Sequence, residues 1–140
     1  MMTPSFELFD HTADMGIWVR AGTPAELLEP AARGLYAAIG ELVPGEAAGS
    51  SKFDLTGGDR AVLLRDFLTE LLILFERDHL MVTQVEQVTF DDGQLRATVR
   101  LHQFDADRSD FAREVKAVTY HELEVCEVDG GYEARVIVDI

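Results

Sequence analysis

Five residues near the start of the chain, DHTAD (Asp10–Asp14), place two carboxylates and an imidazole between two stretches of strand-like sequence. Carboxylate oxygens are the ligands that hard cations such as calcium and magnesium prefer, so Asp10 and Asp14 are candidate metal ligands. His11 is a candidate general base. The same composition is also typical of a polar turn whose side chains bond to their own backbone. Both interpretations remain open from this stretch alone.

A second pair of anionic groups lies at the end of the sequence, where Asp139 precedes Ile140 and its carboxylate. The apolar run Val136–Val138 leads directly into this pair, which argues for an anchored end, although chain ends usually fray. A buried carboxylate needs a counter-charge. A cation could supply it, and so could Lys116.

Lys116 is one of two lysines beside ten arginines, and it falls on a predicted strand. A lysine on an edge strand can simply discourage aggregation. It can also act as a compact cation that contacts phosphate or balances a carboxylate cluster. The remaining histidines show no metal-ligand spacing, and no phosphate-binding loop, nucleophile elbow or zinc motif is present.

Strands and helices must position these groups. Period-two alternation predicts strands in SFELFD and MGIWVRA. A capping box at Thr23 and Glu26 predicts the start of a first helix, which Pro30 should kink. A second helix should begin after Asp59, and PGEAAGSS (Pro44–Ser51) should form a loop.

From Leu80 onward the pattern is that of strands, with hairpin turns at FDDGQL and VDGGY. A bulge is expected near His121, where the apolar side of the strand switches. Strands in runs separated by two helices predict an α+β fold. We expect a two-layer sandwich of a largely antiparallel or mixed sheet, with both main helices packed on one face.

Length and charge bound the function further. The 140 residues suit one domain spanning 1–140. The formal net charge of −14 disfavours direct binding to nucleic acid and favours basic protein partners or cations. The single cysteine fits a reducing cytosol, and neither a signal peptide nor a membrane span is apparent. We therefore expect a cytoplasmic protein.

Three stretches in order, FDHTADMGIWVRAGT, EVKAVTYHELEV and VIVDI, together resemble the archease family, and the similarity extends over nearly the whole chain. Archeases are small acidic proteins that assist the RNA ligase acting on 3′-phosphate or 2′,3′-cyclic phosphate ends, in tRNA splicing or RNA repair. The resemblance implies a non-enzymatic activator that promotes guanylylation and multiple turnover of that ligase.

The resemblance also implies a metal site made by Asp14, Asp139 and the Ile140 carboxylate, with calcium as the ion and magnesium as the alternative. Lys116, His11 and Asp10 would complete the functional cluster. In this hypothesis an acidic tip enters the basic active-site mouth of the ligase. Two rival hypotheses remain: a metal-dependent phosphoesterase using Asp14, Asp139, His11 and Lys116, and an acidic adaptor with no specific ligand.

Overall fold

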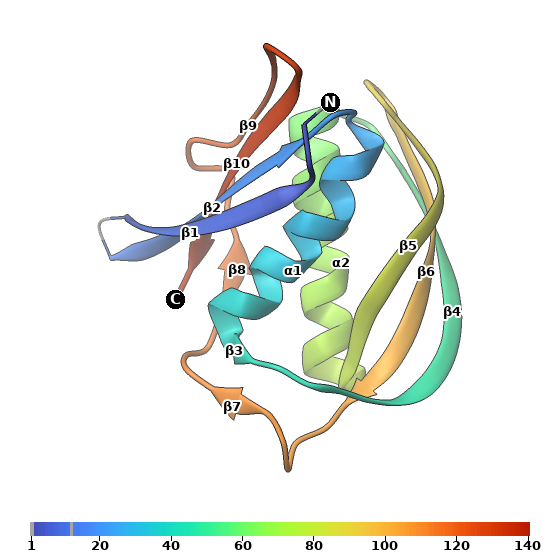
Figure 1. Cartoon of the computed structure of the whole chain (residues 1–140), viewed down its shortest axis with the longest axis vertical. Coiled ribbons are helices and arrows are strands. Elements are labelled where there is room, and N and C mark those ends of the chain that lie inside the picture. Colours follow the sequence, from blue (N-terminus) through green and yellow to red (C-terminus); the bar gives the residue numbers. More distant parts are fainter. Residues whose placement is uncertain (1, 12) are drawn as a thin grey trace.

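The first and last strands of the chain belong to one five-stranded sheet (Figure 1). The computed structural model describes residues 2–11 and 13–140, and for His11 it describes the backbone alone. The strand order is β1-β2-β10-β8, and β9 also pairs with β10. These strands are β1 (Ser5–His11), β2 (Asp14–Ala21), β8 (Ala117–Val118), β9 (Glu124–Val128) and β10 (Gly131–Asp139).

The middle of the chain forms a three-stranded sheet in the order β4-β6-β5. Its strands are β4 (Pro44–Thr56), β5 (Leu80–Asp91) and β6 (Gln94–Phe104). The loop expected at Pro44–Ser51 is wrong, because this segment pairs with β6 as the first half of β4. Two register shifts and the positive φ of Gly49 let this weak strand former follow its partner.

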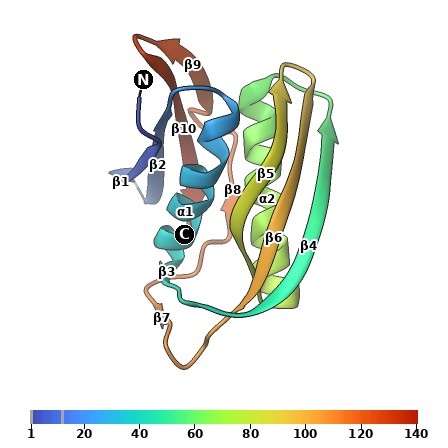
Figure 2. The same ribbon diagram turned by 45° about the vertical axis from the view of Figure 1, so that its right-hand side comes forward.

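The helices lie between the two sheets (Figure 2). A 3-10 turn η1 (Ala25–Leu27) precedes α1 (Leu28–Ile39), and α2 spans Arg60–Asp78. A short pair, β3 (Gly40–Glu41) with β7 (Asp110–Phe111), closes one end. Every strand pairing among the described residues is antiparallel. The α+β sandwich is confirmed, with the refinement that its strands divide between separate sheets.

The first helical segment differs from the kinked helix that the sequence predicts. Half of the predicted capping box forms: the Glu26 amide donates to Thr23 Oγ1 at 3.3 Å, but the Glu26 carboxylate accepts from the Thr23 hydroxyl, at 2.9 Å, in place of the Thr23 amide. The helical segment is then divided between η1 and α1. Pro30 falls in the first turn of α1, where a missing N–H leaves no intrahelical bond unmade.

Turn and cap signals are confirmed elsewhere. Asp59 caps α2 by accepting from the Val62 amide at 3.0 Å. Both predicted hairpins form, and Gly93 and Gly130 adopt positive φ in their turns. The expected bulge near His121 is instead a full interruption, since β8 and β9 are separate strands that pair with different parts of β10.

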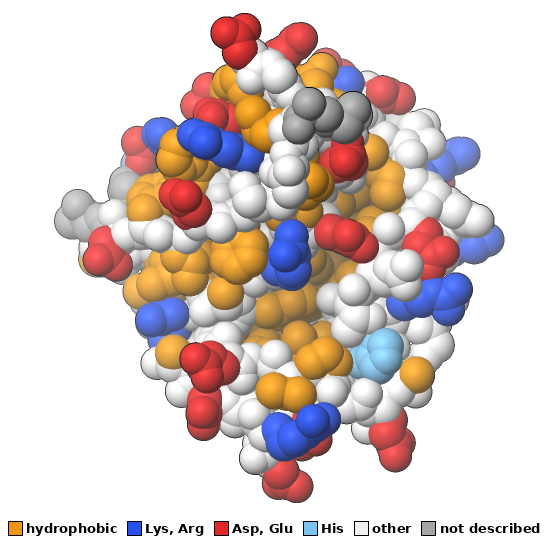
Figure 3. Space-filling model, viewed as in Figure 1, with side chains coloured by type: hydrophobic (Ala, Val, Ile, Leu, Met, Phe, Trp, Pro, Cys, Tyr) orange, Lys and Arg blue, Asp and Glu red, His pale blue; other side chains and the backbone are white. Residues whose placement is uncertain are grey.

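The open edge of β5 is bonded by side chains from α1. The Val82 amide donates to the Tyr36 hydroxyl at 2.8 Å, and the Val85 amide donates to the Glu29 carboxylate at 2.9 Å. On the face seen in Figure 3, hydrophobic side chains gather toward the middle, with acidic and basic side chains interspersed around them. No helix in the described part of the chain is long and apolar enough to span a bilayer.

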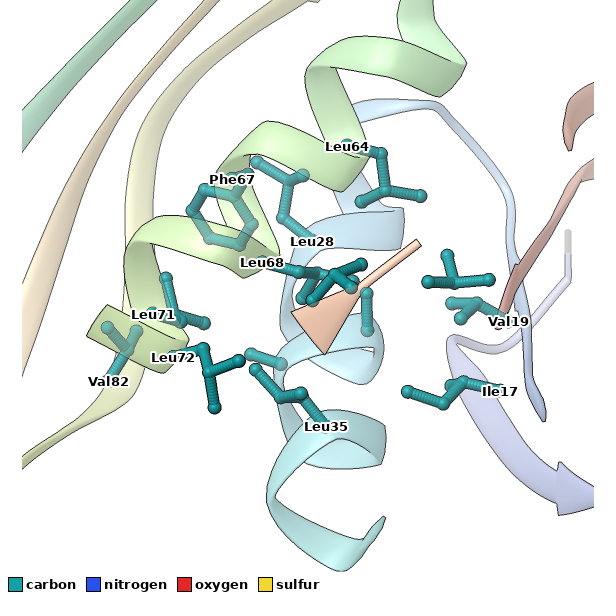
Figure 4. Close-up of a cluster of buried hydrophobic side chains, with 14 of the residues drawn as sticks. Ile17, Val19, Leu28, Leu35, Leu64, Phe67, Leu68, Leu71, Leu72 and Val82 are labelled. Carbon is teal, nitrogen blue, oxygen red and sulfur yellow. The ribbon is translucent and has the colours of Figure 1, made fainter. Parts of the chain in front are cut away.

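The core lies between the five-stranded and three-stranded sheets, around α1 and α2 (Figure 4). Ile17 and Val19 of β2 point toward leucines from both helices, and Phe67 of α2 is fully buried. Burying such side chains contributes about 1.5–3 kcal/mol each before the loss of conformational entropy. Packing of these side chains against both helices therefore fixes the position of β2 along its own axis, and with it the position of its first residue, Asp14.

Candidate acidic site at the end of the five-stranded sheet

Strand register brings the two ends of the chain side by side. In the ladder between β2 and β10, Asp14 is the direct partner of Asp139. Across β1 and β2, Asp14 is also the partner of His11. Asp139 in turn faces Ala117 of β8. His11, Asp14, Asp139 and Ala117 therefore form one row across four strands, which we call the acidic row.

The acidic row lies on the side of the sheet away from the helices. Neighbouring positions Met15, Val138 and Val118 are buried in the core. Successive strand residues point to opposite faces, so Asp14 and Asp139 point away from that core. Asp14 is half-buried and Asp139 is exposed. Directly opposed residues of an antiparallel pair have Cβ atoms about 4.5–5.5 Å apart, so both carboxylates can contact one ion.

A tight connection precedes Asp14. The β1–β2 hairpin pairs His11 with Asp14 across two residues, of which Thr12 lies outside the described part. Ala13 has φ of 61°, a left-handed conformation that costs a non-glycine residue about 1–2 kcal/mol. Core packing of the flanking strands offsets this strain. The first carboxylate of β2 is thereby held at the very end of the ladder.

Lys116 lies beside the acidic row through its backbone. Its amide donates to the carbonyl of Asp139 at 2.7 Å, and its side chain is exposed. The chain therefore brings an amine-bearing residue next to the second carboxylate. Ile140 is half-buried and packs against the core, which anchors the residue that follows Asp139.

The two remaining residues of the predicted cluster, Asp10 and His11, are not shown to contribute side chains to the acidic row. Asp10 pairs with Met15 rather than with Asp14, so it belongs to the next row and to the opposite face from the acidic row. It is exposed. The backbone of His11 stands opposite Asp14, but its side chain lies outside the described residues. Its predicted role as a base therefore stays a prediction.

Sequence reasoning missed the layer that supports the acidic row. Phe9, Gly16 and Ile137 are partners in the adjacent row on the same face. A Cβ on Gly16 would lie 2.0 Å from the Phe9 ring, so the ring rests directly on this glycine. Ile137 is fully buried although it faces away from the helices. The sequence does contain one signal of this contact, because a glycine within a strand pattern often marks a place where another group packs closely against the backbone.

The acidic row is chemically suited to a hard cation. Among the described residues, no three side chains of His, Cys, Asp or Glu gather as a metal cluster. Two side-chain carboxylates, those of Asp14 and Asp139, stand directly opposed, however. Like charges opposed on neighbouring strands destabilise a sheet. An all-oxygen, anionic donor set of this kind fits calcium or magnesium.

Comparisons with known proteins agree on one family. The model described as Archease protein family (MTH1598/TM1083) matches residues 6–140. A protein named archease from Methanopyrus kandleri is 36% identical over 138 residues, covering 96% of this chain and 99% of the relative. Its namesake from Methanosarcina mazei is 36% identical over 141 residues, covering 96% of this chain and 95% of the relative.

Two solved structures share the fold. The solution structure of Methanobacterium thermoautotrophicum protein 1598 has a TM-score of 0.77 at 32% identity, covering 97% of this chain and 99% of that one. The crystal structure of a Thermotoga maritima protein described as an archease and possible chaperone has a TM-score of 0.68 at 19% identity, covering 100% and 98%. The second comparison bears on fold alone.

Proposed function

This chain belongs to the archease family, and on that premise we propose that it is a non-enzymatic accessory protein of the 3′-phosphate RNA-splicing ligase. In this role it promotes guanylylation of the ligase and its repeated turnover in tRNA splicing or RNA repair. The observation that carries the proposal is the pairing of Asp14 with Asp139 at one end of the sheet, because it gathers the acidic groups that the activator role requires.

The proposed ion is calcium, and Asp14, Asp139 and the carboxylate of Ile140 would hold it. A bound cation would supply positive charge that relieves the repulsion between opposed carboxylates. The chain's own residues orient these oxygens, because β2 and β10 are fixed by core packing and Ile140 is anchored beside them. The Lys116 backbone secures Asp139 from the other side.

Charge favours a basic protein as partner. The formal net charge is −14, from 26 acidic and 12 basic residues. Such a surface repels the phosphates of RNA and attracts a basic active-site mouth. Electrostatic attraction raises the rate of encounter and weakens with salt. Stimulation of the ligase should therefore fall as ionic strength rises.

The test is guanylylation of purified cognate ligase with GTP, measured with and without this protein. We expect faster guanylylation and multiple turnover with the wild-type chain, and loss of both effects with Asp139→Asn. Glu127→Gln is the matched control, because it removes one exposed carboxylate from β9, outside the acidic row. Unchanged rate and turnover at saturating wild-type protein would refute the proposal.

A two-residue extension after Ile140 tests the ligand set separately. It moves the terminal carboxylate away from Asp139 while leaving the side chains in place. We expect calorimetry to show weaker calcium binding by the extended chain. Intact affinity would remove Ile140 from the site. Phosphoester hydrolysis by this protein alone, lost in Asp14→Ala, would instead support the phosphoesterase hypothesis.

A further inference from the structure

An aromatic groove lies at the end of the molecule closed by β3 and β7. It has a volume of about 630 Å³ and is walled by the ends of both helices and by the segment 111–115. Three rings contact one another there: the centroid of Phe104 lies 5.0 Å from that of Phe75 and 5.7 Å from that of Phe111, and the last two lie 6.3 Å apart. Phe111 is 56% exposed. The volume and the apolar lining suit the binding of one or two side chains.

The wall of the groove is held firmly in place. The amides of Ala112 and Arg113 both donate to the Ile39 carbonyl, at 2.8 and 3.1 Å. The Arg113 guanidinium donates to the Ala38 carbonyl. These three donors satisfy the last two carbonyls of α1, those of Ala38 and Ile39. The groove is therefore preformed, which reduces the entropy lost when a partner binds.

The lining of the groove holds two carboxylates and one guanidinium, so its formal charge is negative. Glu76 of α2 and Glu114 are exposed, and neither makes a hydrogen bond or ion pair with any described residue. The Arg113 guanidinium is engaged by the helix end instead. An apolar floor beneath free carboxylates is complementary to an apolar side chain followed or preceded by a basic one.

The groove and the acidic row are linked by a short stretch of chain. Glu114 and Val115 line the groove, and the next residue, Lys116, bonds through its amide to Asp139. A short extended segment thus connects the two surfaces.

From these observations we propose that the aromatic groove is a second docking site for the ligase. It takes a large apolar side chain that lies next to a lysine or arginine in a segment of that protein. The identity of the partner rests on the proposed function, whereas the chemistry of the occupant follows from the groove. The groove contributes affinity, and the acidic row contributes the effect on guanylylation.

The test separates binding from activation. Calorimetry measures binding to purified ligase, and a guanylylation assay gives the concentration of this protein required for half-maximal stimulation. Phe111→Ala removes the exposed ring. Its control is Ile73→Ala, which removes an apolar side chain that is 40% exposed on α2 but does not line the groove. Glu76→Lys reverses a charge at the mouth on an exposed helix surface, with Glu127→Lys as control.

We expect Phe111→Ala to raise the half-maximal concentration by roughly tenfold or more, as for a buried aromatic anchor, with the maximal rate unchanged. Glu76→Lys should raise it by about threefold to tenfold at low salt and by less at high salt. Because Glu76→Lys leaves the aromatic packing intact, it remains informative if Phe111→Ala unfolds the segment.

If Phe111→Ala and Glu76→Lys give the same half-maximal concentrations as their two control variants, the groove proposal is wrong and the activator function is unaffected. Groove-dependent binding without any stimulation by wild-type protein would overturn the activator function and support the groove. If the wild-type chain does not bind the ligase at all, both proposals are wrong.

Discussion

Replacing Asp139 by asparagine should stabilise the protein when calcium is absent and weaken it, relative to wild type, when calcium is present. The change keeps the size of the side chain and removes its charge. In the ladder, Asp139 stands directly opposite Asp14. The variant therefore removes a repulsion between two strands whose packing is otherwise unchanged.

The expected change in the free energy of unfolding follows from the strand register. Two unit charges about 5 Å apart repel by about 0.8 kcal/mol in a water-like dielectric, and physiological salt screens roughly half of this. Asp139→Asn should thus raise the free energy of unfolding by about 0.5 kcal/mol in EDTA. If the proposed site binds calcium, the ion at 100 times its dissociation constant would stabilise wild type by about 2.7 kcal/mol. The variant should then be less stable than wild type by about 2 kcal/mol.

Urea unfolding followed by circular dichroism, in EDTA and in saturating calcium, measures both values. Glu127→Gln is the control, since it changes net charge by the same amount away from Asp14. The reasoning is refuted if Asp139→Asn destabilises the protein equally in both conditions, because that result assigns the carboxylate a structural role without an ion. Equal stabilisation of wild type and variant by calcium would place the ion elsewhere.

Three further predictions concern the framework of the site. Phe67→Ala should lower the free energy of unfolding by about 3–5 kcal/mol in denaturant titrations, because the ring is fully buried between helix and sheet. Tyr36→Phe should lower it by about 1–3 kcal/mol, because the Val82 amide loses its buried acceptor. Burial raises the pKa of Tyr36 to about 12, so its contribution is complete below pH 10 and is lost as pH rises from about 10 to 12; Tyr36→Phe should abolish this part of the pH dependence. Gly16→Ala should lower the melting temperature and weaken calcium binding, because the new methyl displaces the Phe9 ring beside the acidic row; adding Phe9→Leu should partly restore both, and a fully tolerated Gly16→Ala would contradict the packing described.

Local signals in the sequence predicted much of the fold. Asp59 as a cap and the Asp-Gly turns act through their nearest neighbours, and all appear as expected. The failures involve distant partners. Pro44–Ser51 is a strand only because β6 lies beside it. The interruption between β8 and β9 likewise depends on where each can pair with β10.

In the candidate site, too, local sequence predicted the residue types but not their arrangement in space. The residue types of Asp14 and Asp139 suggest oxygen ligands, but their separation in sequence gives no distance between them. Antiparallel register supplies it, and the structure places them as direct partners. Asp10 illustrates the converse, since a strand that alternates faces sets it apart from Asp14 despite their closeness in the chain. The packing of Phe9 on Gly16 required knowledge of the register between β1 and β2.

The bonds from Tyr36 and Glu29 to the amides of β5 have a consequence for self-association. An uncovered strand presents a row of donors and acceptors onto which another molecule can add its own strand, and repeated addition leads to fibres. Here a hydroxyl and a carboxylate from α1 already occupy two of these donors. Replacing both side chains at once should therefore turn this strand edge into a template for polymerisation.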